Sequence, residues 1–223
     1  ILRKYILGNE EIDSIVKSPF ELKNKSIEDI VLEKFKPYYN QTIDSIGEKF
    51  NVDRGGKNYH NRIASAILNL KGKIKGNETF PKVDEFEKAS IVVKTVKFNK
   101  NNINKESMSF PAFRFKDLIK EKWEDEDGNP LAQWHNFLLE TRFLFFIVKE
   151  EEGTEVFKGV KFFSMPEDDI EGPVKKVWED TKDKLLKGVC LKATYKKDGN
   201  VYRIENNFIN KSDEMICHIR PHE

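Results

Sequence analysis

The sequence has few of the residues from which metal and disulfide sites are built. Its 223 residues include two cysteines and four histidines, and no CxxC spacing occurs, so zinc ligands cannot come from sequence neighbours. We expect Cys190 and Cys217, which both lie in apolar segments, to be buried thiols in a reducing cytosol rather than a disulfide. His218 and His222 have a ligand spacing for a helix, but Pro221 between them disfavours that helix.

Long apolar runs and an excess of either charge are also missing. No stretch of about 18 apolar residues occurs, which excludes a membrane-spanning helix. The 39 Lys and Arg nearly balance 38 Asp and Glu, leaving a net charge of +1. A protein that coats nucleic acid indiscriminately needs a basic excess, so this balance excludes such a protein but not a sequence-specific reader with one basic face. Neither an initiator Met nor a signal peptide is present, and we expect the chain to be part of a longer protein.

What the sequence does contain is enough apolar material for a core, including 17 Phe. Residues 1–22 are expected to form a linker and an N-terminal helix, and residues 23–223 one domain. Its class is predicted as α/β (α+β mixed), with a central mixed β-sheet flanked by helices. Helices are expected at 26–36, from 42, at 61–70 and at 167–186, and strands at 89–98, 137–148, 156–163, 189–195 and 201–208. Segment 110–115 is a weaker strand or a loop.

Two segments with a possible chemical role have ordinary interpretations, and nucleotide-binding motifs do not occur. Residues 125–130 superficially resemble a calcium loop, but they lack the alternating ligands and distal Glu, so we predict a turn. Ser164 has no GxSxG motif around it and is expected to cap the helix at 167–186. No GxGxxG or GxxxxGK[ST] motif supports binding of a nucleotide.

One segment carries part of a nuclease pattern. Metal-dependent nucleases place one acid at a strand end, then a second acid and a Lys two residues apart on the next strand. The acids hold Mg²⁺ on the scissile phosphate, and the Lys orients water or stabilises developing charge. Here Pro81 precedes Asp84 and Glu85, and Lys94 is present, but Val92 stands at the position of the second acid.

With these residues, the sequence resembles the MutH-like GATC-cutting endonucleases, and among them the C-terminal half of the Sau-type GATC-specific type II restriction endonucleases. The similarity covers the whole chain, in blocks at 42–46, 54–58, 63–72, 85–94, 143–148 and 219–221. It implies a MutH-like restriction-endonuclease fold. It also implies an acid-bearing helix, a strand pair with the catalytic acid and Glu-x-Lys, and a late Ile-Arg-Pro loop that reaches the DNA.

The resemblance implies that the catalytic site has degenerated. Glu85 matches the family's Asp, and Lys94 matches its catalytic Lys. Val92 stands where the family has a metal-binding Glu, and Leu68 where it has a Glu on the helix. At most one acid is left, which is too little to neutralise a metal and a phosphate together. We therefore expect this chain to have no catalytic residues and no metal of its own.

The DNA-contacting positions are better kept. Arg220 and Pro221 match the reading loop, with His222 in place of a basic residue, and Arg suits bidentate contact with guanine. Further candidates for phosphate contact are Arg54 and Lys57 in a Gly-rich loop and Lys71, Lys73 and Lys75 beyond the third helix. The alternative for these lysines is a solvated surface stretch. The family continues past Pro221 into a further helix and strand, so isolated DNA affinity is expected to be weakened.

The leading hypothesis is a non-catalytic effector domain that binds double-stranded GATC DNA and promotes cleavage by an N-terminal catalytic domain of the same polypeptide. The parent enzyme, a type II site-specific deoxyribonuclease of the bacterial cytoplasm, would use Mg²⁺, and a homodimer on DNA is compatible with it. Two alternatives stay open. One is an active Mg²⁺-dependent GATC endonuclease or nickase with a relocated acid, Asp84 or Glu87. The other is a structural dimerisation module that does not touch DNA.

Overall fold

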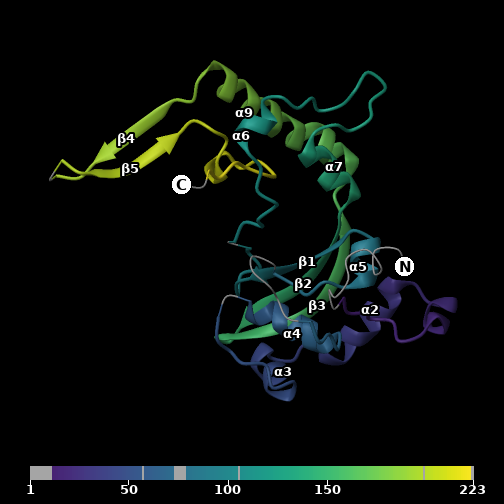
Figure 1. The fold of residues 1–223 in the computed structure, drawn as a ribbon. Helices are drawn as coiled ribbons and strands as arrows, with labels where there is room; N and C mark the ends of the chain where they lie inside the picture. Colours follow the sequence, from purple (N-terminus) through teal and green to yellow (C-terminus); the bar gives the residue numbers. More distant parts are fainter. Residues whose placement is uncertain (1–11, 57, 73–78, 105, 198, 222–223) are drawn as a thin grey trace. The chain divides into compact units, whose positions relative to one another are not determined.

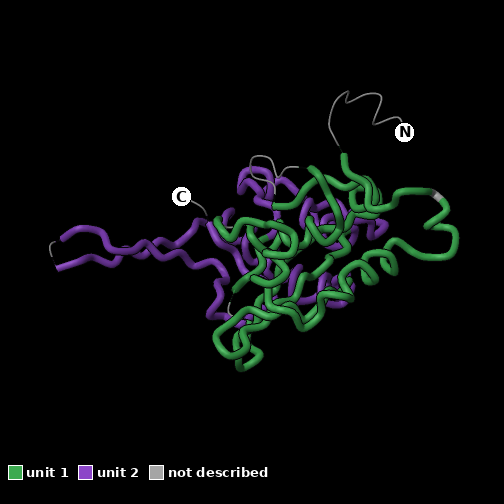
Figure 2. The backbone as a smooth tube through the Cα atoms, turned by 90° about the horizontal axis from the view of Figure 1, so that it is seen from below, with its two compact units in different colours: residues 1–109, 141–163 green, residues 110–140, 164–223 purple. Residues whose placement is uncertain are grey.

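The computed structural model describes residues 12–56, 58–72, 79–104, 106–197 and 199–221. The chain divides into two compact units, which Figure 2 shows in different colours. Unit 1 consists of residues 1–109 and 141–163, and unit 2 of residues 110–140 and 164–223. Each unit is therefore assembled from two separated segments of the chain. The predicted boundary after residue 22 stays a prediction.

A three-stranded mixed sheet forms the centre of unit 1 (Figure 1). Its order is β1 (Ile91–Phe98), β2 (Arg142–Glu151) and β3 (Thr154–Ser164). β1 and β2 run parallel, whereas β2 and β3 are consecutive and joined by a tight turn. Glu152 and Gly153 have positive φ angles of 50° and 79°, as the central residues of a type I′ hairpin turn require. The hairpin that the sequence predicts here is confirmed.

Helices begin in unit 1 where the sequence supplies caps. Ser26 forms a capping box with Asp29 at the start of α2 (Ile27–Phe35), and the Thr42 hydroxyl accepts from the Ser45 N–H at the start of α3 (Ile43–Lys49). Both starts agree with the prediction. α4 (Tyr59–Ile67) starts two residues and ends three residues earlier than predicted. Its early end follows from Asn69, which adopts a left-handed φ of 60°. The shorter helices are η1 (Pro19–Lys23), η2 (Lys36–Tyr38) and α5 (Asp84–Lys88).

The core of unit 1 lies between the sheet and the helices α2, α3 and α4, which Figure 1 shows along one face of the sheet. An aromatic cluster joins the two layers: the rings of Phe146 and Phe157 stack at a centroid distance of 4.4 Å, and Phe35 of α2 lies 6.0 and 5.9 Å from them. Each such buried side chain contributes about 1.5–3 kcal/mol. This packing fixes the face of β1 that is turned away from the core.

Unit 2 consists of helices and a separate two-stranded sheet. Its elements are α6 (Phe115–Leu118), α7 (Gln133–Glu140), α8 (Glu167–Asp169), η3 (Ile170–Val174), α9 (Lys175–Lys187), β4 (Leu191–Tyr195), β5 (Val201–Asn206) and η4 (Lys211–Asp213). The predicted break at Gly172-Pro173 lies within a π-helical turn, η3, between α8 and α9. The secondary structure as a whole confirms a mixed α/β chain with a mixed sheet and flanking helices.

Three local predictions are wrong. The strand expected from Phe137 starts only at Arg142, because residues 137–140 complete α7. Ser164 is the last residue of β3, and Pro166 is the N-cap of α8, without a side-chain hydrogen bond. Both cysteines are free, but only Cys217 is buried.

Unit 2 has a buried polar contact at His135 and an exposed turn that the sequence predicts. His135 is buried, with its Nδ1 3.0 Å from the Trp123 carbonyl oxygen and its Nε2 2.7 Å from a Glu171 oxygen. The segment 125–130 is a turn, as predicted: the Asp125 carboxylate accepts from the backbone N–H groups of Asp127 and Asn129 at 2.9 and 2.8 Å. Within the described residues, no helix is long and apolar enough to cross a membrane.

Candidate functional site

Val92 and Lys94 lie on β1, two residues apart and therefore on the same face of the strand. Their parallel neighbours on β2 are Phe143 and Phe145. The core-facing residues alternate with them, as the burial of Ile91 shows. The predicted strand is thus present, and Val92, at the position that the resemblance assigns to an acid, is apolar.

The amine of Lys94 is engaged in a structural bond. Its Nζ donates to the Ser109 carbonyl oxygen at 2.6 Å. Burial lowers the pKa of Lys94, because an ammonium loses hydration in a partly buried position. This lysine therefore closes the loop that follows β1.

The carboxylate of Glu85 is also engaged in hydrogen bonds. It lies on α5 and accepts from the Ser14 hydroxyl at 2.6 Å and from the backbone N–H groups of Ile15 and Val16 at 3.1 and 3.0 Å. Both of its oxygens take part. Glu85 thus fastens the N-terminal segment of unit 1 to α5, a structural role that sequence reasoning did not foresee.

Leu68 is the C-cap of α4 and is only 1% exposed. Its side chain belongs to the core of unit 1 together with Ile63 and Phe86. An ionised carboxylate in the same place would be buried at high cost. The position that carries an acid in the resembling family is therefore part of the apolar packing here.

The fold brings the four positions onto neighbouring elements, since α4 and α5 both contact β1. The alternative acid Asp84 is paired with Lys88, one helical turn later, at 2.5 Å. In the described part of the chain, no three His, Cys, Asp or Glu side chains are grouped so that they could hold a metal ion.

Arg54 lies in a loop that is held in place by α4. Arg62 of α4 donates through Nη2 to the carbonyl oxygens of Asp53, at 2.8 Å, and of Gly55. Arg54 itself is 78% exposed at its side chain and makes an ion pair with Asp44 at 3.1 Å. Such an exposed pair is weak, so the guanidinium can exchange Asp44 for another anion. Lys57 in the same loop lies outside the described residues.

The C-terminal segment presents Arg220 and Pro221 on an anchored backbone. Ile219 is buried, and its N–H donates to the Ile209 carbonyl oxygen at 3.0 Å, while Arg220 and Pro221 are exposed. Lys71 is exposed beyond the end of α4. The other candidates, Lys73, Lys75 and His222, lie outside the described residues. Arg54 and Lys71 belong to unit 1 and Arg220 to unit 2.

One polar cluster of unit 1 appears only in the structure. His60 of α4 lies with Nε2 2.8 Å from an oxygen of Glu155 in β3, and Lys97 of β1 is 3.1 Å from the other oxygen. Burial, followed by the charge of Lys97, lowers the pKa of His60. Burial acts to raise the pKa of Glu155, but its bonds with Lys97 and His60 outweigh this and lower it. His60 and Glu155 are 95 positions apart in the sequence, which explains why no local pattern predicted their contact.

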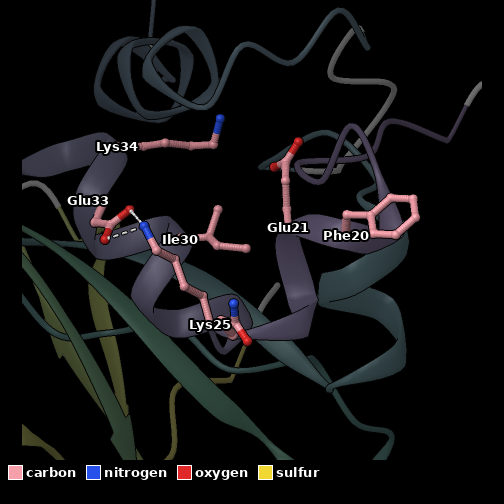
Figure 3. Close-up of a pocket in the computed structure, with 7 residues that line it drawn as sticks. Phe20, Glu21, Lys25, Ile30, Glu33 and Lys34 are labelled. Atoms are coloured by element: carbon pink, nitrogen blue, oxygen red, sulfur yellow. Dashed lines mark hydrogen bonds and ion pairs between the residues drawn. The ribbon is translucent and has the colours of Figure 1, made fainter.

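A hollow of about 490 Å³ lies beside α2, lined by Phe20, Glu21, Asn24, Lys25, Ile30, Glu33 and Lys34. Figure 3 shows the ion pair between Lys25 and Glu33, at 2.6 Å, beside Ile30. None of the predicted site residues lines this hollow.

The comparisons with known proteins agree with the resemblance at a coarse level. No family model matches the sequence. Over 226 aligned positions, which include all of this chain, it is 64% identical to the type II restriction enzyme Sau3AI of Staphylococcus aureus. The chain spans 46% of the length of that relative. The whole of the chain is therefore similar to just under half of a type II restriction enzyme.

Proposed function

We propose that this chain is a non-catalytic, DNA-binding effector domain of a type II restriction endonuclease, with a MutH-like fold. It binds a GATC sequence in double-stranded DNA and promotes cleavage by an N-terminal catalytic domain of the same polypeptide. Mg²⁺ serves that catalytic domain and not this chain. The partners are GATC DNA and the catalytic domain, and two copies can meet on DNA.

The state of the four catalytic positions is the observation that carries this proposal. Leu68 is part of the core, and Val92 is apolar. The two polar residues that remain, Glu85 and Lys94, are engaged in bonds to Ser14–Val16 and to Ser109. Hydrolysis of a phosphodiester with Mg²⁺ needs carboxylates to hold the metal and stabilise developing charge. A lone Lys supplies neither.

Exposed basic side chains support DNA binding. Arg220 projects from a segment anchored by Ile219, which suits a residue that reads a base edge. Arg54 and Lys71 are exposed in the manner of phosphate contacts. The similarity to part of a type II restriction enzyme supports DNA as the ligand. Binding of a second DNA copy at such a domain can regulate cleavage elsewhere through a coupling free energy.

A binding titration with a cleavage control tests the proposal. The chain is titrated by fluorescence anisotropy with a GATC duplex and with a duplex in which these four bases are permuted, and is incubated with GATC plasmid and Mg²⁺. We expect preferential binding of GATC without cleavage. Arg220→Ala should lose about 5- to 150-fold in GATC affinity, since a bidentate base contact contributes about 1–3 kcal/mol. Lys36→Ala, an exposed lysine of η2, is the matched control.

Two outcomes would overturn the proposal, and each identifies an alternative. Equal, salt-insensitive affinity for both duplexes would favour a structural dimerisation module. Plasmid cleavage that Lys94→Ala abolishes would identify an active nuclease, and Asp84→Asn and Glu87→Gln would then find the relocated acid.

A further inference from the structure

The β4–β5 hairpin of unit 2 is largely exposed. Figure 1 shows it extending away from the end of α9. Every residue of β4 is exposed, as are the first four of β5. The exposed fractions of its large apolar side chains are 69% for Leu191, 63% for Tyr195, 52% for Val201, 68% for Tyr202 and 61% for Ile204. An isolated two-stranded hairpin is only marginally stable in water. We therefore expect this exposed hairpin to be stabilised by a bound partner.

The strand register separates two faces. Lys192 pairs with Glu205 and Thr194 with Arg203, so these four side chains share one face. Leu191, Ala193 and Tyr195 lie on the other face, with Ile204 opposite Ala193. A bulge after Thr194 pairs Tyr195 with Val201 and brings Tyr202 next to this pair. One face is thus polar and the other apolar.

Positive charge and aromatic rings gather toward the tip. Lys196 and Lys197 form its turn, where the Lys196 N–H donates to the Asn200 carbonyl oxygen at 2.8 Å. Each tyrosine is followed directly by a basic residue: Tyr195 by Lys196, and Tyr202 by Arg203. The hairpin, residues 191–206, contains four Lys and Arg against two acids, Asp198 and Glu205. Arg203 is 3.3 Å from Glu205, but both side chains are well exposed, and such a pair is readily exchanged.

We propose that the β4–β5 hairpin is a DNA-binding ribbon, whose tip residues Tyr195, Lys196, Lys197, Tyr202 and Arg203 enter a groove of the duplex. This inference rests on the proposed function and adds a contact surface to it. The Lys and Arg side chains neutralise phosphates on both sides of the groove. The tyrosines contact sugars and phosphates through their hydroxyl groups and rings.

Charge and shape favour duplex DNA over another protein as the occupant. The basic excess of the hairpin contrasts with the near neutrality of the whole chain and complements a polyanion. The major groove of B-DNA is wide enough for a two-stranded β-ribbon. A protein partner would account for the apolar face alone and would leave the lysines at the tip without a role.

Salt-dependent titrations of the GATC duplex test this role. One variant replaces Lys196, Lys197 and Arg203 with Ala, and a second carries Tyr195→Ser and Tyr202→Ser. The control replaces three exposed lysines of unit 1, Lys17, Lys36 and Lys161, with Ala. Because the hairpin side chains are exposed, circular dichroism should show all variants folded. In the first variant, the slope of log K against log salt should fall by about 0.9 for each phosphate that is no longer neutralised, with at least a tenfold weaker affinity. The control should keep the wild-type slope.

The outcomes separate this inference from the proposed function. Wild-type binding to GATC with unchanged affinity and slope in both hairpin variants would overturn the hairpin's role and leave the proposed function standing. A wild-type chain without preference for GATC would overturn the proposed function itself. A tyrosine variant that changes only the oligomeric state in sedimentation would assign the apolar face to a second copy, against the proposal. A reduced slope in the hairpin variant alone supports it.

Discussion

Leu68→Glu and Val92→Glu, made one at a time, restore the two acids that the resembling family carries, and the structure predicts very different costs. Leu68 is 1% exposed and packed in the core of unit 1. Losing its side chain there costs about 2–5 kcal/mol, as for a buried Leu→Ala change. A carboxyl group without partners adds about 1–3 kcal/mol. We therefore expect Leu68→Glu to lower the free energy of unfolding by at least about 3 kcal/mol.

Val92 offers the opposite case. It is only partly buried, on the face of β1 that also carries Lys94, so a Glu side chain there can reach solvent and has a cation two residues away. The lost apolar burial amounts to about 1 kcal/mol. We expect Val92→Glu to cost less than about 1.5 kcal/mol.

Urea unfolding followed by circular dichroism measures both costs. A Glu buried at position 68 is neutral in the folded state, with its pKa raised by burial, so its penalty grows as the pH rises above the ordinary value of about 4.3. Leu68→Gln serves as the matched control, without a titratable group and hence without this pH dependence. Equal costs for the two Glu variants, or a pH-independent cost for Leu68→Glu, would refute the assignment of Leu68 to the apolar core.

Two further stability predictions concern unit 1. Glu85→Ala should lower the free energy of unfolding in urea by about 2–3 kcal/mol, because it leaves the N–H groups of Ile15 and Val16 without their charged acceptor. An unchanged urea midpoint would contradict the structural role of Glu85. For His60, whose folded pKa is lowered by burial, the unfolded chain binds the proton more readily, so stability should fall as the pH drops below about 6.5. The lowered pKa of Glu155 adds a loss in the same direction at lower pH. His60→Gln should make the free energy of unfolding less dependent on pH between about pH 7 and about pH 5. An unaltered pH dependence would show that it does not arise from His60.

Local signals predicted the elements whose ends are fixed by neighbouring residues. Ser26 and Thr42 start helices through caps that involve residues three positions later, and the Glu152-Gly153 turn is closed within the hairpin. The apolar run from Phe137 misled the prediction because a short apolar run fits a helix end and a buried strand equally well. Leu138 is buried whereas Leu139 is 40% exposed, and neither position identifies a helix without its tertiary neighbours.

The candidate site shows the same limit more strongly. The resemblance predicts that Glu85 and Lys94 are remnants of a catalytic site, but their contacts in this chain are with partners far along the sequence or in a loop. Glu85 binds residues about 70 positions earlier, and Lys94 binds a carbonyl oxygen 15 positions later. No periodicity or spacing encodes such pairings. The division into two units is equally hidden, because each unit combines two segments that are separated in the sequence.

Replacement of the acids is favourable for a domain that binds DNA without cutting it, and Val92→Glu makes this testable. A carboxylate beside a phosphate repels it unless a metal ion bridges the two. Under the proposal that this chain holds no metal there, an apolar residue at position 92 removes that repulsion. We expect Val92→Glu to weaken binding of the GATC duplex in EDTA, and Val92→Gln, which has the same size but no charge, to weaken it less. Equal affinities of the two variants, measured at low salt where repulsion is least screened, would show that this face of β1 does not meet the DNA backbone.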